Sequence, residues 1–100
     1  MKLMHRWFIY LFNFRKNNKG FVKCYECEKW MHEDNYKMLS SCYSHILNKT
    51  NYKQYAGKPW NLKITHPECH QLFELFPQKA IKQHSLYLEL LEKHKNGELQ

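Results

Sequence analysis

Two short pairs of metal-ligand residues constrain this chain more than any other feature of its sequence. Cys24 and Cys27 form a C-x2-C pair. His66 and Cys69 form a second pair with the same spacing, and 38 residues separate the two pairs. A structural zinc ion takes four sulfur or nitrogen ligands in a tetrahedron, commonly from two such pairs. One zinc ion held by all four residues would pin the base of an early strand to the start of a later helix.

Two alternatives to this set of four zinc ligands stay open. In the first, Cys42 replaces His66 and gives an all-thiolate ligand set with an irregular spacing. We favour instead that Cys42 is a buried or half-buried free thiol. A chance C-x2-C pair, with Cys69 as a buried thiol, is the other alternative. Four cysteines in a secreted protein would indicate two disulfides, but this spacing favours metal ligation in a reducing compartment. We therefore expect a cytoplasmic protein with a structural zinc ion.

The length predicts a single domain over residues 1–100, because chains usually have roughly 100–200 residues per domain. A domain of this size buries a modest core and often needs a metal or a disulfide for stability. The longest apolar run, from Trp7 to Phe12, has six residues, whereas a membrane-spanning helix needs about 20. We expect no membrane span and interpret the run as a buried strand or a turn of helix.

Local patterns predict an α+β fold. Residues 21–23 and 41–47 are compatible with strands, and residues 61–65 alternate polar and apolar side chains as a half-buried strand does. Pro67 suits the first position of a helix that continues to Phe76 and ends at Pro77. The side chains expected to face inward from this helix are Leu72, Phe73 and Phe76.

A C-terminal helix is predicted over about residues 79–95. Its apolar spacing and its C-terminal glycine, Gly97, are both typical of a helix that packs on one face. The residues at helical spacing are Ile81, His84, Leu88 and Leu91, flanked by Tyr87 and Leu90.

The charge of the chain is unevenly distributed. Residues 1–63 hold twelve basic and four acidic residues, whereas residues 64–100 hold four basic and five acidic ones. A basic half beside a nearly neutral half is typical of a surface that meets a polyanion, most often nucleic acid. A lysine-rich solubility surface is the alternative. Because 14 of the 16 basic residues are lysine, which binds phosphate as a point charge, we expect little reading of base sequence.

Three further polar positions lie between or directly after the ligand pairs. Ser44-His45 stands between them, and the last stretch reads Asn61-Leu-Lys-Ile-Thr-His-Pro-Glu-Cys-His70. In this order and spacing, residues 24–76 resemble the HNH endonucleases, in particular the zinc-bearing phage recombination endonucleases. The resemblance implies a small zinc-stabilised ββα-metal domain, followed here by the C-terminal helix. It also implies a cytoplasmic location in a bacterial or phage-infected host cell.

The resemblance implies a metal-dependent DNA endonuclease that hydrolyses phosphodiester bonds. His45 is the implied general base, since a neutral imidazole near pH 7 can accept the proton of the attacking water. His70 is the implied ligand of a catalytic Mg²⁺ or Mn²⁺ ion, which neutralises developing charge. Asn61 either ligates this ion or braces the loop so that His45 points correctly. The loop 48–60 is expected to contact DNA phosphates through Lys49, Lys53 and Lys58.

Ser44 departs from the family pattern. Many members carry Asp or His at this position as a second metal ligand, and a neutral hydroxyl is a much poorer ligand. The ion would then bind weakly or recruit another residue, and His66 is already required by zinc. Two alternatives to an enzyme therefore stay open: a non-catalytic zinc-containing module that binds nucleic acid, and a basic protein–protein adaptor.

Overall fold

The first element is a helix that covers one side of the core. In the computed structural model, residues 3–100 are described, with side chains from residue 5 onward. Helix α1 spans Leu3–Arg15 and contains the apolar run 7–12, which therefore forms helix and not strand. Phe8, Leu11 and Phe12 are buried, as their i, i+3, i+4 spacing on one helix face requires.

Within residues 3–100, the β structure consists of two antiparallel hairpins. The first pairs β1 (Phe21–Lys23) with β2 (Trp30–His32). The second pairs β3 (Tyr43–His45) with β4 (Leu62–Ile64). The predicted strands at 21–23, 41–47 and 61–65 are thus confirmed, the last two in shortened form. Residues 40–42 form a 3₁₀ turn, which delays the start of β3.

The segment that follows the first cysteine pair is more regular than its polar sequence indicates. Strand β2 buries Met31 completely, and a one-turn helix, α2 (Glu33–Tyr36), follows directly. The ring Nδ1 of His32 accepts a hydrogen bond from the Asp34 amide at 3.2 Å and so caps this turn. Pairing with β1 makes a strand of a segment whose own pattern is too short to predict one.

Two longer helices complete the chain. Helix α3 spans Pro67–Leu75, begins at Pro67 and ends before Pro77, as predicted. Helix α4 spans Ile81–Lys95 and starts two residues later than expected, because Pro77–Lys79 form a 3₁₀ turn. Gly97 adopts a φ of 71° just after α4, which confirms it as the C-terminal residue in the left-handed region.

The inward faces of α3 and α4 differ from the sequence expectation. Phe76 was expected to be buried but is 55% exposed, because the helical backbone ends at this residue and its ring lies against Lys79 instead of the core. On α4, Ile81 is 72% and Leu88 is 52% exposed. The buried residues of α4 are Gln83 and Leu90. The inward face of this helix therefore contains a polar side chain as well as an apolar one.

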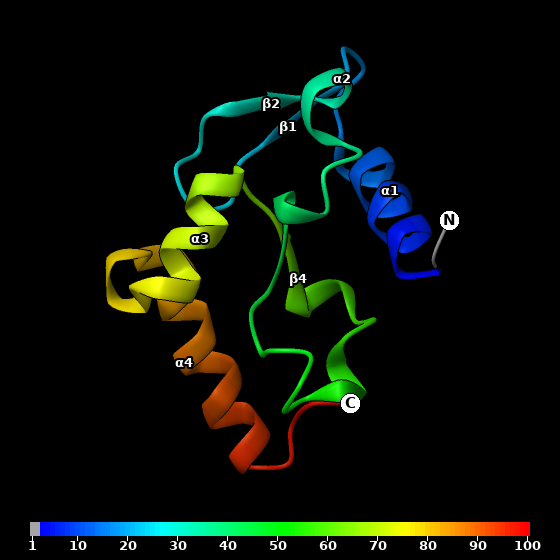
Figure 1. Cartoon of the computed structure of the whole chain (residues 1–100). Helices are drawn as coiled ribbons and strands as arrows, with labels where there is room; N and C mark the ends of the chain where they lie inside the picture. The colour runs from blue at the N-terminus through cyan, green and yellow to red at the C-terminus, as the bar shows by residue number, and fades with distance from the viewer. Residues whose placement is uncertain (1–2) are drawn as a thin grey trace.

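The arrangement is an α+β fold in which helices flank the β3–β4 hairpin on opposite sides. Figure 1 shows α1 on one side of this hairpin, α3 and α4 on the other, and the β1–β2 hairpin at the top. One hydrophobic cluster joins α1 to residues of both hairpins, including Val22, Met31, Tyr43 and Ile64. A second cluster joins the segment after β3 to α4. No described helix is long and apolar enough to cross a membrane.

Candidate functional site

The structure brings both ligand pairs together. The ligand atoms of Cys24, Cys27, His66 and Cys69 all lie within 4.8 Å of one another, which agrees with a tetrahedral site whose metal–ligand bonds are about 2.0–2.3 Å. The first pair lies in the turn of the β1–β2 hairpin, and the second lies at the start of α3. The group is therefore positioned to hold a metal ion, and three thiols with one imidazole suit zinc.

Individual contacts show how these ligands are oriented. The Sγ of Cys27 lies 3.2 Å from Nδ1 of His66, so this ring nitrogen faces the centre of the group. The amide of His66 donates to Sγ of Cys24 at 3.3 Å, a bond that orients the sulfur. Burial, followed by the nearby thiols of Cys24 and Cys27, raises the pKa of Cys69. A bound cation reverses this effect because a coordinating thiol is deprotonated.

Cys42 lies outside this group. It is fully buried, and burial raises the pKa of its thiol to about 12. A thiol with this pKa stays protonated at neutral pH, so Cys42 behaves as a small core side chain. This agrees with the expectation of a buried free thiol.

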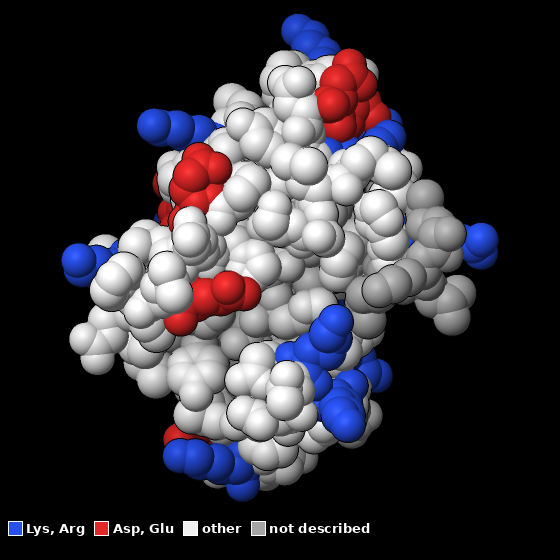
Figure 2. All heavy atoms as spheres, viewed as in Figure 1, with Lys and Arg blue, Asp and Glu red and all other residues white. Residues whose placement is uncertain are grey.

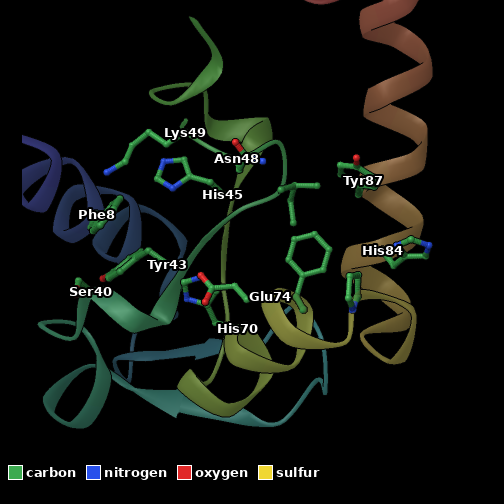
Figure 3. Close-up of a pocket in the computed structure, with 13 residues that line it drawn as sticks. Phe8, Ser40, Tyr43, His45, Asn48, Lys49, His70, Glu74, His84 and Tyr87 are labelled. Atoms are coloured by element: carbon green, nitrogen blue, oxygen red, sulfur yellow. The ribbon is translucent and has the colours of Figure 1, made fainter. Parts of the chain in front are cut away.

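A pocket of about 610 Å³ lies between β3, α3 and α4. Its lining includes His45 at the end of β3, Lys49 in the following loop, and His70 and Glu74 on α3. Figure 3 shows His45 beside Lys49 and, below them in the view, His70 beside Glu74. The expected general base and the expected metal ligand therefore share one pocket, although the chain separates them by 24 residues, 46–69.

His45 is held in a defined orientation. Its Nε2 lies 3.0 Å from the carbonyl oxygen of Ala56. Because a carbonyl only accepts, Nε2 carries the proton and Nδ1 is the basic nitrogen of the ring. Burial lowers the pKa of His45; the bond to Ala56 opposes this shift, and Lys49 and His70 add to it. The ring is therefore mostly neutral at pH 7.

His70 and Glu74 form a pair one helical turn apart. His70 donates from Nδ1 to the carbonyl of Ser41 at 2.8 Å, which leaves Nε2 facing a carboxylate oxygen of Glu74, also at 2.8 Å. A neutral Nε2 and a carboxylate are both acceptors, so their contact needs either a proton or a cation. Glu74 is exposed. Its i, i+4 spacing from His70 is the sequence signal that could have identified it.

Asn61 lies away from the pocket and is fully buried. Its Oδ1 accepts from the amide of Leu47 at 2.7 Å, and its Nδ2 donates to the carbonyls of Leu47 and Tyr55 at 3.0 and 3.2 Å. These bonds join Asn61, at one end of the loop 48–60, to Leu47 at its other end. The carbonyl of Ala56 in this loop accepts the hydrogen bond from His45. Of the two expected roles, this geometry is that of a brace, because ligation of a metal would require these bonds to break.

Ser44 is fully buried on the opposite side of β3 from the pocket lining. Its hydroxyl donates to Oε1 of Gln83 at 2.7 Å. The Ser44 side chain is therefore engaged with α4 instead of the pocket. The sequence pattern gave no signal for Gln83, because one glutamine in an amphipathic helix normally lies on its solvated face.

The loop 48–60 carries three lysines and borders this pocket at its start. Lys49 lines it, Lys49 and Lys53 are exposed, and Lys58 is half-buried. Figure 2 shows Lys and Arg side chains gathered in the lower part of this face, over the region where Figure 1 places that loop. Acidic side chains form separate small groups on the same face. The loop therefore presents positive charge next to the pocket.

Comparisons with known proteins add no further constraint. No protein-family model matches the chain. No curated protein and no solved structure is similar to it either. The arguments for function therefore come from the geometry of the metal-ligand group and of the pocket.

Proposed function

We propose that this protein is a zinc-stabilised, metal-dependent DNA endonuclease in which His45 is the general base. The observation that carries the proposal is the state of His45. The Ala56 carbonyl assigns the proton to Nε2, burial keeps the ring neutral, and the ring lines a pocket that contains His70 and Glu74. A neutral imidazole with a free Nδ1 is able to take the proton of a water molecule that attacks a phosphodiester.

The order of elements supports the same proposal. The β3–β4 hairpin leads through His66 directly into α3, which is the hairpin-plus-helix order that the resemblance to HNH endonucleases implies. His45 lies on the first strand of this unit and His70 on its helix. Asn61, at the turn before the second strand, braces the intervening loop.

We assign the catalytic divalent ion to His70 and Glu74. The Ser41 carbonyl holds Nδ1 of His70 and leaves Nε2 as the coordinating nitrogen, a common arrangement for histidine ligands. The carboxylate of Glu74 supplies the oxygen ligand that Mg²⁺ and Mn²⁺ prefer, and such ions usually keep several waters. Glu74 thus provides the second metal ligand, which Ser44 does not provide. When bound, the ion would neutralise charge on the phosphate.

The proposal is tested by incubating supercoiled plasmid with the protein in the presence of Mg²⁺, Mn²⁺ or a chelator. Nicking should require the divalent ion. His70→Ala and Glu74→Gln should each weaken Mn²⁺ binding by about tenfold or more, since even outer-shell changes cost about 10–100-fold. Glu92→Gln, which changes an exposed acid on α4 outside the pocket, is the matched control. Wild-type Mn²⁺ affinity in both pocket variants would contradict the assignment.

The lysines of the loop are expected to dominate DNA affinity. Replacing Lys49, Lys53 and Lys58 together with glutamine should make the slope of log affinity against log salt shallower by about 2–3, at about 0.9 per phosphate contact. Replacing Lys19, Lys29 and Lys79, which are exposed and lie outside the loop 48–60, removes the same charge elsewhere and should leave the slope nearly unchanged. Fluorescence anisotropy with a labelled duplex measures both slopes. Equal slopes in the two triple variants would exclude the loop as the DNA contact.

A further inference from the structure

A buried glutamine connects the metal-ligand group to the strand that carries His45. Gln83 is fully buried on α4, and both its amide oxygen and its amide nitrogen are hydrogen-bonded. Its Oε1 accepts from Ser44 at 2.7 Å, and its Nε2 donates to Oε1 of Glu26 at 3.1 Å and to the carbonyl of Cys69 at 3.0 Å. A fully satisfied amide in a core fixes the relative position of every element that it contacts.

One of these partners belongs to the metal-ligand group, and another lies between two of its ligands. Glu26 lies between Cys24 and Cys27, and Cys69 is itself one of the four ligands. The carboxylate of Glu26 also accepts from the amides of Lys82 and Gln83, both at 3.0 Å. The first amides of a helix have no hydrogen-bond acceptor within the helix itself. The residue before α4, Ala80, offers no side-chain cap, and Glu26 supplies the acceptor for these two amides. Glu26, held between the first two cysteines, therefore caps the start of α4 and contacts Gln83.

The third partner belongs to the pocket side of the fold. Ser44 directly precedes His45 on β3, and it is fully buried against Gln83. A change in the position of Gln83 would leave the Ser44 hydroxyl without a partner in the core, which is unfavourable. The strand would then shift or twist, and the ring of His45 would move relative to the Ala56 carbonyl.

We propose that Gln83 is a positioning residue that makes the orientation of His45 depend on the Cys24–Cys69 metal centre. The proposal rests on the role of His45 proposed above. The connection runs from the first cysteine pair through Glu26 to Gln83, and from Gln83 through Ser44 to His45. Gln83 does not line the pocket, and its side chain is hydrogen-bonded to Ser44, Glu26 and Cys69, so its effect on His45 passes through the strand.

The decisive variant is Gln83→Leu, studied as the full-length, zinc-loaded protein. Zinc content should stay at the wild-type value, because no ligand is changed. In ¹⁵N NMR spectra the ring of wild-type His45 should show one tautomer, with the proton on Nε2, whereas Gln83→Leu should show a mixture of tautomers. In plasmid nicking, kcat should fall by roughly ten- to hundredfold, since a misplacement of about 1 Å costs about 10²-fold. KM should stay nearly constant.

Two further variants separate positioning from loss of stability. Ser44→Ala breaks the same connection at its other end, so it should reproduce the tautomer mixture even if Gln83→Leu fails to fold. The double variant should then be no worse than the more affected single one. Leu11→Ala removes a buried side chain of α1 outside the connection; it should lower the melting temperature and leave the single Nε2–H tautomer intact.

The outcomes distinguish this inference from the proposed nuclease function. If Gln83→Leu or Ser44→Ala folds with zinc bound and keeps both the single tautomer and the wild-type kcat, the positioning role is wrong. If the wild type fails to cleave DNA, the nuclease function is wrong, and the tautomer measurement still decides whether Gln83 orients His45.

Discussion

Replacing His45 with alanine is expected to lower the rate of metal-dependent DNA nicking by about 10²–10⁴-fold, the usual contribution of a positioned general base. DNA affinity and zinc content should stay nearly constant, because the base acts in the transition state whereas affinity comes from lysines. Wild-type activity should fall as the pH drops and His45 becomes protonated. Burial lowers its pKa from the ordinary 6.5, so the midpoint of this fall should lie below pH 6.5.

His5 offers a matched control for this experiment. Its Nε2 also lies near a backbone carbonyl, that of Met38 at 3.2 Å, but it does not line the pocket. His5→Ala should therefore nick DNA at the wild-type rate. If the wild type cleaves no duplex, branched or single-stranded DNA with any divalent ion, and His45→Ala binds DNA as before, the non-catalytic nucleic-acid-binding module becomes the better interpretation.

Loss of the metal-ligand group should be the most destabilising change in this protein. Structural zinc contributes on the order of 10 kcal/mol to folding in small zinc domains, comparable with the whole stability of an ordinary domain, about 5–15 kcal/mol. Here the group ties the β1–β2 hairpin to the start of α3, and the strands of both hairpins are only three residues long. Cys27→Ser should abolish stoichiometric zinc binding and cooperative thermal unfolding. Metal analysis and circular dichroism measure both.

Cys42 provides the control for this prediction. It is buried but lies outside the group of four ligands, so Cys42→Ala should cost a modest amount of stability and keep one zinc ion per chain. Loss of zinc in Cys42→Ala, or an unchanged fold in Cys27→Ser, would show that the ligand set is wrong.

The sequence by itself was sufficient to predict the residues of the metal-ligand group and the positions of most helices and strands. Two residues of a C-x2-C pair lie close together in any fold, and thiols with imidazole have a strong preference for zinc. Pro67 and Gly97 predicted helix boundaries correctly because their backbone preferences are local. Strands 21–23 and 61–65 could be predicted from short apolar patterns, since the next residues in each case supply ligands that anchor them.

Only the tertiary structure decided which side chains meet. The apolar run of α1 was ambiguous between helix and strand, because a buried run of six residues has no clear period. On α4 the apolar spacing correctly predicted Leu90 as buried but was wrong for Ile81 and Leu88, because the Glu26 cap and the bonds of Gln83 orient the helix more specifically than these two side chains do. The bracing by Asn61 and the contact of Ser44 with Gln83 likewise depend on partners that are distant along the chain. Such partners are set by packing and buried hydrogen bonds, which no local sequence pattern specifies.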